Sequence, residues 1–197
     1  MAWWNDLLNS IFPPAYRAPV PPATSTSLAV PQPSFLDIIL GAPKRTPILT
    51  RPTNISQYGV DMIARHEQFS AQAYRDAAGH WTIGYGHKIV WGDGLSNAMT
   101  LSEPQARAIL SRDLQVAVNC VRGRVSAYLT QAQFDALVSL AFNIGCGAFS
   151  GSTLLKLVNA GQFNLAAQEF PKWIYANGQV AYGLVSRRTE EQQLFLA

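Results

Sequence analysis

The sequence predicts an α+β fold in which a small antiparallel sheet lies near the front of a mainly helical domain. Two capping boxes, each followed by apolar residues at helical spacing, predict helices in the second half of the chain. Large apolar residues on both sides of a glycine-containing turn predict a β-hairpin between Gln72 and Tyr85. The chain shows no internal repeat of the kind that builds solenoid proteins.

Residues 1–53 are predicted to form an N-terminal arm, and residues 54–197 the main domain, because the composition changes near residue 54. A short helix with an apolar stripe is expected at the start, formed by Trp3, Trp4, Leu7, Leu8 and Ile11. Pro13 and Pro14 end it, and a proline-rich, extended spacer follows. We expect Trp3, Trp4 and Leu7 to be buried against protein, and the arm to be dispensable for chemistry.

The front of the main domain is predicted to be a helix followed by the hairpin. Ser56 can cap the helix, whose inner face carries Val60, Ile63 and Ala64. The hairpin turns at residues 76–79. Its strands carry a set of large side chains: Tyr74, Trp81, Ile83 and Tyr85.

The back of the domain is predicted to be helical. Ser102 with Gln105 is a capping box that opens a helix with apolar positions through Val118. Thr130 with Gln133 opens a second helix, which Gly145 ends. Three shorter helices are expected over Thr153–Asn159, Leu165–Phe170 and Leu184–Leu196.

Charged residues make up 14% of the chain, against a usual quarter, and the net charge is +3. This mild basicity suits an anionic polymer, but it fits a protein without such a partner equally well. No basic stripe or recognition motif indicates nucleic-acid binding. No segment approaches the roughly 20 apolar residues of a membrane span. The first residues lack the basic start of a secretory signal, so we expect synthesis in the cytosol.

The cysteines and histidines indicate no metal site. His66, His80 and His87 form no metal-binding pattern, and Cys120 and Cys146 form no CxxC pair, so we expect neither metal nor cofactor. The two cysteines are interpreted either as buried free thiols or as one disulfide. Both fall near predicted helix ends, so our hypothesis is a disulfide that forms in an oxidising compartment. Cα atoms more than about 7 Å apart would exclude it.

Two carboxylates are candidates for catalysis. Glu67 falls at the end of the first predicted helix and Asp76 at the hairpin turn, so the folded-back chain can hold both across a cleft. Cleavage of a glycosidic bond needs one protonated carboxyl group and one ionised partner.

The neighbours of these carboxylates in the sequence favour different protonation states. Apolar residues near Glu67 favour its protonated form, and Arg75 favours the ionised form of Asp76. Taken alone, the pair fits a surface helix end and an ordinary turn aspartate as well.

The spacing of these residues resembles the phage lysozyme family, glycoside hydrolase family 24, which includes the T-even phage lysozymes and many endolysins. The family pattern is a Glu, eight residues, an Asp, five residues and a Thr within W-T-x-G-x-G-H. This chain has Glu67, Asp76 and Thr82, within the run WTIGYGH. Three more segments match in register: LTQAQFDAL from Leu129, FNIGCGAF…STL from Phe142, and GLVSRR from Gly183. The resemblance covers about Ser56 to Ala197.

The resemblance implies a lysozyme-like fold with a small sheet lobe, a larger helical lobe and the active-site cleft between them. It implies a muramidase that hydrolyses the β-1,4 bond between MurNAc and GlcNAc in peptidoglycan. Glu67 would be the general acid. Asp76 and Thr82 would activate the attacking water, so that the anomeric centre is inverted. In that case the two carboxyl groups should lie roughly 6.5–9.5 Å apart.

Supporting roles are implied for further residues. Arg187 aligns with an arginine that pairs with the catalytic Glu67, and His87 with a structural histidine that pairs with an aspartate, here Asp113. Cleft-lining or supporting positions are implied at Phe142, Asn143 and Tyr85. Where the family often has threonine, this chain has Lys88, from which we expect little consequence.

Several functional alternatives remain open. A lytic transglycosylase needs one acid–base glutamate and no water-activating partner, and a wall-binding module needs neither. As an endolysin, the protein would be a monomer made in the host cytoplasm that reaches periplasmic peptidoglycan through a holin lesion. The proline-rich arm also fits a virion-associated lysozyme whose N-terminal helix docks on a virion protein.

Overall fold

The computed structural model describes residue 49 and residues 51–197, apart from 77 and 177. The predictions for the N-terminal arm, including the helix and spacer and the burial of Trp3, Trp4 and Leu7, lie outside the described residues. They remain predictions.

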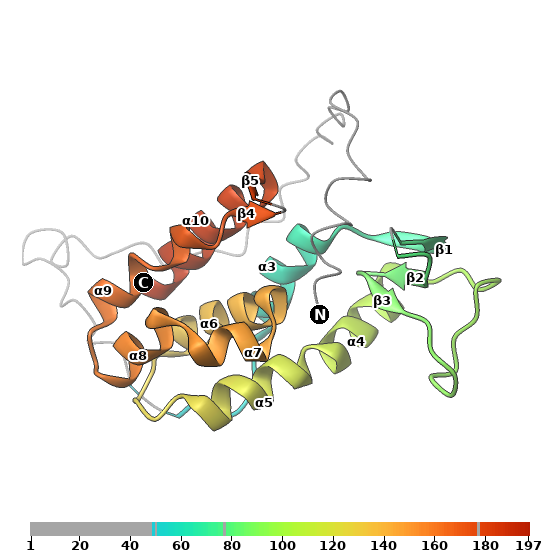
Figure 1. Cartoon of the computed structure of the whole chain (residues 1–197). Helices are drawn as coiled ribbons and strands as arrows, with labels where there is room; N and C mark the ends of the chain where they lie inside the picture. The colour runs from blue at the N-terminus through green and yellow to red at the C-terminus, as the bar shows by residue number, and fades with distance from the viewer. Residues whose placement is uncertain (1–48, 50, 77, 177) are drawn as a thin grey trace, which may run out of the picture.

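A small sheet and a larger group of helices make up the described part of the chain (Figure 1). Helix α3 (Gln57–Glu67) leads into a three-stranded antiparallel sheet of order β1-β2-β3. Its strands are β1 (Ser70–Arg75), β2 (Trp81–Gly84) and β3 (His87–Lys88). Figure 1 shows this sheet on one side of the molecule and helices α5 to α10 on the other. The α+β fold class is therefore confirmed.

The helices that follow lead away from the sheet and build the larger lobe. They are α4 (Glu103–Asp113), α5 (Gln115–Arg124), α6 (Gln131–Ile144), α7 (Cys146–Gly151), α8 (Thr153–Asn159) and α9 (Phe163–Ala167). A 3-10 turn, η1 (Phe170–Lys172), and a short hairpin of β4 (Tyr175–Ala176) and β5 (Gln179–Val180) precede the last helix, α10 (Tyr182–Leu196). No helix within residues 51–197, so far as they are described, is long and apolar enough to cross a membrane.

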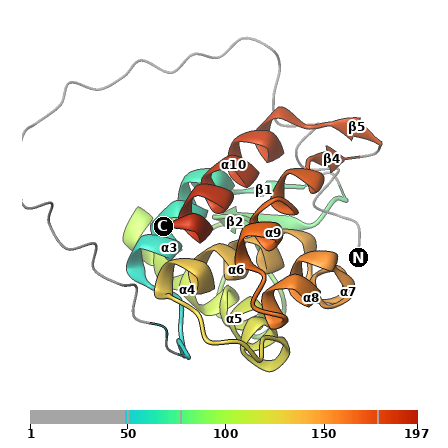
Figure 2. The same ribbon diagram turned by 90° about the vertical axis from the view of Figure 1, so that its left-hand side faces the viewer.

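Two apolar clusters form the core. The larger one surrounds α6, which is buried without interruption from Phe134 to Ala141 and lies beneath α10 (Figure 2). The smaller cluster joins α3, β2 and α4. Phe142 is half-buried and packs against both clusters, so it connects the two lobes.

Local capping explains where the main helices begin. The predicted capping boxes are present, with Gln105 Oε1 accepting from Ser102 N at 2.8 Å and Gln133 Oε1 accepting from Thr130 N at 3.0 Å. The predicted cap at Ser56 is also present, since its hydroxyl oxygen accepts from Gly59 N at 3.2 Å.

The start of α3 is tied to the middle of the helical lobe. Asp135, buried on α6, accepts a hydrogen bond from Ser56 N at 3.0 Å and a second one from the Ser56 hydroxyl. The two helices approach closely there, because a Cβ at Gly59 would lie 2.9 Å from Asp135 Cγ. This contact joins residues 79 positions apart, and local sequence patterns did not predict it.

Several element boundaries differ from the prediction. The helix expected from Ser102 through Val118 is divided into α4 and α5 at Leu114, although backbone hydrogen bonds continue across that residue. The helix expected over Leu165–Phe170 runs instead as α9 and then the turn η1. Pro171 explains this change, because proline lacks the N–H of an α-helix and clashes with the carbonyl four residues earlier. The short elements β3, α7, β4 and β5 were not predicted, and α10 begins at Tyr182, before the expected Leu184.

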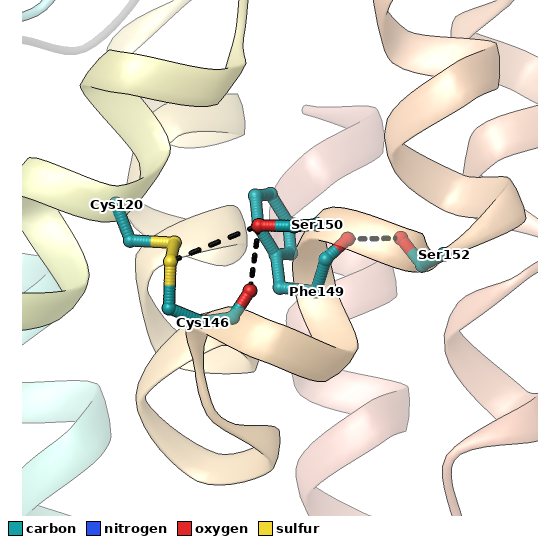
Figure 3. Close-up of a disulfide and its surroundings, with 5 residues drawn as sticks. All are labelled: Cys120, Cys146, Phe149, Ser150 and Ser152. Atoms are coloured by element: carbon teal, nitrogen blue, oxygen red, sulfur yellow. Dashed lines mark hydrogen bonds between the residues drawn. A yellow bond between two sulfur atoms is a disulfide. The ribbon is translucent and has the colours of Figure 1, made fainter.

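A disulfide joins Cys120 on α5 to Cys146 at the start of α7, with their Cα atoms 5.8 Å apart (Figure 3). The disulfide hypothesis is therefore confirmed, and the free-thiol alternative is wrong. Helix α7 is held further by Ser150 Oγ, which donates to the Cys146 carbonyl at 2.7 Å. Ser152 Oγ donates to the Phe149 carbonyl at 2.7 Å, where α7 gives way to α8.

Candidate active site

Glu67 is the last residue of α3, and the backbone changes direction directly after it. Gln68 has φ 57° and ψ 143°, the one positive φ among the described non-glycine residues. This conformation is unfavourable for a residue with a Cβ. It ends the helix and sends the chain into β1, while the Glu67 side chain remains only 4% exposed.

Arg187 from α10 contacts Glu67 directly. Its Nη1 donates to Glu67 Oε1 at 2.6 Å, so the predicted pairing is confirmed. Burial lowers the pKa of Arg187, but the nearby charges of Glu67 and Glu191 outweigh that effect and raise its pKa above the usual value. A permanent positive charge therefore faces Glu67. The expected burial of this carboxyl group is confirmed, and a buried guanidinium lies against it.

Glu67 belongs to a buried group of four charges. Glu191 accepts from Arg187 Nε at 3.2 Å and from Arg188 Nη2 at 3.0 Å, and these three side chains are at most 4% exposed. The two glutamates and two arginines balance each other in charge. Burial, the largest influence, lowers the pKa of Arg188 to about 10. We call these four side chains the charge tetrad.

The α6 helix supports the charge tetrad through Ser139, whose hydroxyl donates to Glu191 Oε1 at 2.6 Å. Neither Ser139 nor Glu191 was assigned a role from the sequence. A signal was present, because Arg187, Arg188 and Glu191 lie three and four residues apart in a chain that is poor in charge.

Asp76 follows β1 and begins the hairpin turn. It is 8% exposed, and its Oδ1 accepts from His80 N at 2.8 Å. Backbone hydrogen bonds from Gly79 N to the Asp76 carbonyl, at 2.8 Å, and from Asp76 N to the His80 carbonyl, at 2.9 Å, close the turn. The turn thus fixes the carboxylate through its own backbone.

The expected partner of Asp76 is replaced by other groups. Arg75 donates to the Gly79 carbonyl at 2.5 Å and lies over the Trp81 ring, so the expectation that it supports Asp76 is wrong. Lys88 Nζ lies 3.7 Å from Asp76 Oδ2, and His80 Nδ1 lies 3.3 Å from Oδ1.

Together these groups determine the pKa of Asp76. Burial, the largest single influence, raises it. The His80 amide hydrogen bond and the charges of Lys88 and His80 bring the pKa below its usual value overall.

Thr82 lies at the centre of the sheet and is 1% exposed. Its cross-strand partners are Tyr74 on β1 and Lys88 on β3. Directly opposed residues of antiparallel strands point to the same face, so these three side chains share one face of the sheet. The Thr82 hydroxyl donates to the His80 carbonyl at 3.4 Å.

Tyr74 provides an electrostatic link between the two carboxylates. Burial raises the pKa of its hydroxyl, and the negative charges of Asp76 and Glu67 raise it further. Both carboxylates therefore lie within electrostatic reach of one phenol. The sequence indicated Tyr74 only as a hairpin residue, and its electrostatic interaction with both candidate acids was missed.

The supporting residues divide into two groups. Tyr85 is 6% exposed, and its hydroxyl contacts Glu103 Oε1 at 3.0 Å, which places it in the core of the sheet lobe. Phe142 and Asn143 are half-buried at the end of α6. Among the described residues, no three His, Cys, Asp or Glu side chains gather as a metal site.

His87 occupies the structural position that was predicted. Its Nδ1 lies 2.7 Å from Asp113 Oδ2, which confirms the expected pair, and its Nε2 lies 3.3 Å from Asp93 Oδ2. Asp93 also accepts from Val90 N at 2.7 Å and Leu95 N at 2.8 Å. His87 thus connects β3 to α4 and to the loop between them.

Comparisons with known proteins extend this description. The family described as Phage lysozyme matches residues 64–191. The endolysin of Bacillus phage PZA is 43% identical over 143 residues, which are 72% of this chain and 54% of that protein. The endolysin of Salmonella phage P22 is 38% identical over 144 residues, covering 73% of this chain and 98% of that protein.

A solved structure shows the same fold. The muramidase domain of SpmX from Asticaccaulis excentricus matches with a TM-score of 0.67 and 39% identity, over 74% of this chain and 99% of that chain. The lysozyme-like fold expected from the resemblance is therefore confirmed. The chain spans about half the length of the two Bacillus phage endolysins that it matches.

Proposed function

Because the chain belongs to the phage lysozyme family, we propose that it is a muralytic hydrolase that acts as a phage endolysin on bacterial peptidoglycan. We further propose that it cleaves the β-1,4 bond between MurNAc and GlcNAc with inversion, as in glycoside hydrolase family 24 and its T-even phage members. The observation that carries the proposal is the buried contact of Arg187 with Glu67, at 2.6 Å, in a chain that also builds a turn around Asp76.

Glu67 is proposed as the general acid. Its carboxyl proton passes to the glycosidic oxygen as the bond to the anomeric carbon breaks, and the leaving sugar departs with that proton. The glutamate is then left as an anion, and the fixed guanidinium of Arg187 stabilises it. The charge tetrad holds that guanidinium in place during the proton transfer.

Asp76 and Thr82 are proposed to hold the attacking water. The water oxygen forms the new bond to the anomeric carbon, and Asp76 accepts the proton that the water loses. The ionised form of Asp76 is required for this step, and its lowered pKa supports that role. A crystal structure should place the two carboxyl groups roughly 6.5–9.5 Å apart, whereas a gap near 5 Å would favour a retaining mechanism.

Substitution of Glu67 tests the assignment. Glu67→Gln keeps the shape and removes the acid, so clearing of purified peptidoglycan should fall by orders of magnitude, with the circular dichroism spectrum unchanged. Glu103→Gln, which makes the same change on a side chain that is 52% exposed, is the matched control. Substantial clearing by folded Glu67→Gln would refute the role of the acid.

Product analysis distinguishes the hydrolase from a lytic transglycosylase. Hydrolysis leaves reducing MurNAc ends, whereas a transglycosylase leaves the 1,6-anhydro form. Asp76→Asn should abolish most activity in a hydrolase. The transglycosylase alternative would gain if this variant were fully active and the products were anhydro sugars.

The biological setting is proposed to be host lysis, with the protein made in the host cytoplasm and released to the wall through a holin lesion. The alternative, a virion-associated lysozyme, depends on residues 1–53. Mass spectrometry of purified virions separates the two settings. A chain that starts at Asn54 should still cleave isolated peptidoglycan. Loss of that cleavage in a folded protein would contradict the proposal that the arm is dispensable for chemistry.

A further inference from the structure

We propose that Lys88 is a positioning residue of the hydrolytic site that keeps Asp76 ionised and oriented toward the attacking water. This inference rests on the proposed function. It also replaces the expectation from the sequence that a lysine at this position has little consequence.

Lys88 and the hairpin turn interact with different oxygens of the Asp76 carboxylate. Lys88 Nζ lies 3.7 Å from Oδ2, while the His80 amide donates to Oδ1 at 2.8 Å. Both side chains are sheltered from water, with 22% of Lys88 and 4% of Asp76 exposed. A charge pair of this kind is weakened less by salt than a pair on the open surface. The carboxylate is therefore held from two sides.

The sheet register brings Lys88 to this place. On β3 it lies opposite Thr82 of β2, and Thr82 lies opposite Tyr74 of β1. One row across the sheet thus carries the proposed water-binding threonine, the phenol that is influenced by both carboxylates, and the lysine.

The other described side chains near Asp76 are placed differently from Lys88. His80 Nδ1 lies 3.3 Å from Asp76 Oδ1 and 3.3 Å from Lys88 Nζ, but the His80 side chain is 55% exposed, whereas that of Lys88 is 22% exposed. Arg75 is turned onto the Gly79 carbonyl. Tyr74, on the same face of the sheet, supplies no positive charge. Of the two basic side chains that pair with Asp76 in the described part of the chain, Lys88 is the better sheltered from water.

The direction of the effect follows from the pKa of Asp76. Burial raises that pKa, and the His80 amide, Lys88 and the His80 charge bring it below the usual value. Removal of Lys88 takes away one of the lowering contributions, so the pKa rises. Asp76 then becomes protonated at a higher pH, and the acidic limb of the pH–rate profile moves to higher pH.

The first measurement is the pH profile of kcat/KM on soluble peptidoglycan fragments for Lys88→Met and Lys88→Arg. In Lys88→Met the acidic limb should move to higher pH. The rate should fall most along that limb, where the loss of the Lys88 charge leaves a larger fraction of Asp76 protonated. Lys88→Arg should restore the original limb. The exposed Lys156 supplies the control, because Lys156→Met makes the same change in net charge and should leave the profile unmoved.

The second measurement does not depend on activity. Carbon-13 NMR titration of the Asp76 carboxyl group in the full chain should show a higher midpoint in Lys88→Met and recovery in Lys88→Arg. If Lys88→Met fails to fold, Lys88→Gln takes its place in both experiments. Failure of the proposed function would appear as an absence of muralytic activity in the unsubstituted protein. The titration would still report on Lys88.

Two results would overturn the inference. One is a folded Lys88→Met whose pH profile and Asp76 titration both match the original protein. The other is a raised KM with an unmoved acidic limb, which would assign Lys88 to substrate binding instead.

Discussion

The two carboxylates of the proposed site are held in different ways by different parts of the molecule. Glu67 is fixed from the helical lobe by Arg187, and the charge tetrad behind that arginine is almost completely buried. Asp76 is fixed from the sheet lobe by one turn amide and by the side chains of Lys88 and His80, of which His80 is 55% exposed. One carboxylate depends on a closed set of charges, and the other on groups that contact solvent.

This difference predicts different consequences of substitution around the two carboxylates. A buried and balanced group of charges is costly to break, because removal of one member leaves another charge without compensation. A partly exposed ion pair contributes little to the free energy of unfolding, so its removal costs little stability. We therefore expect substitutions around Glu67 to act strongly on folding, and substitutions around Asp76 to act mainly on the pH dependence of the reaction.

The largest expected effect on stability breaks the charge tetrad. Glu191→Gln removes the carboxylate shared by Arg187 and Arg188, so unfolding in urea should become easier by about 3–5 kcal/mol. The neighbouring Glu190 is the matched control on the same helix. It pairs with Arg65 near the surface, so Glu190→Gln should cost at most about 1 kcal/mol. Equal losses for the two variants would contradict the contrast.

The disulfide gives the helical lobe a second source of rigidity. Cys120 and Cys146 are 26 residues apart, and a closed loop of that length stabilises the folded state by about 3.5 kcal/mol in the chain-entropy account. Replacement of both cysteines with alanine should lower the free energy of unfolding by about that amount. Addition of a reductant to the original protein should give the same loss and should not affect the double variant further. An unchanged denaturation curve under reductant would show that the disulfide does not contribute.

A smaller effect, of opposite sign, is expected at the junction between the two lobes. Gln68 has φ 57°, which glycine adopts without a steric penalty. Gln68→Gly should therefore stabilise the protein by about 0.5–1 kcal/mol in chemical denaturation. Gln68→Ala, which keeps the Cβ, should give no such gain. A destabilised glycine variant would show that the Gln68 side chain contributes more than its backbone conformation costs.

The smallest effect concerns the pH response of the sheet lobe. The hydrogen bond to Asp113 is the largest influence on His87 and raises its pKa. Burial opposes that shift, and the Asp113 charge and Asp93 add to the increase. The stabilisation is full below the unfolded value near 6.5 and is lost as the pH rises through the higher folded pKa. His87→Gln should therefore cost more stability at pH 6 than at pH 9, by less than about 1 kcal/mol. A cost that is equal at both pH values would contradict this linkage.

Local signals predicted much of the fold. The capping pairs at Ser102 and Thr130 predicted where two helices begin, because the side chains that satisfy the free amides lie three residues apart. Strands of two residues, such as β3, are too short to show a period and were missed. Pro171 is a local signal for the end of α9 that the prediction did not use.

Of the contacts between distant residues, one was expected from the family resemblance and others became visible only in the structure. The pairing of Glu67 with Arg187, 120 residues apart, came from the family resemblance and not from any local pattern. Ser139 became recognisable only when α6 and α10 were packed together, because its partner Glu191 lies 52 residues away on the other helix. Lys88 was underestimated because its proximity to Asp76 depends on the register of β2 and β3, which a one-dimensional pattern does not contain.

Helix α3 is attached to the helical lobe at both ends, through Ser56 with Asp135 and through Glu67 with Arg187. Asp76, in contrast, travels with the hairpin that begins after Gln68. If the hairpin moves relative to α10, the distance from Asp76 to Glu67, the proposed general acid, changes with it. The distance between the two carboxyl groups would then report on how far the hairpin has moved. Spectroscopic labels placed on the hairpin and on α10 would measure whether the distance between them changes when peptidoglycan fragments, the proposed substrate, are added.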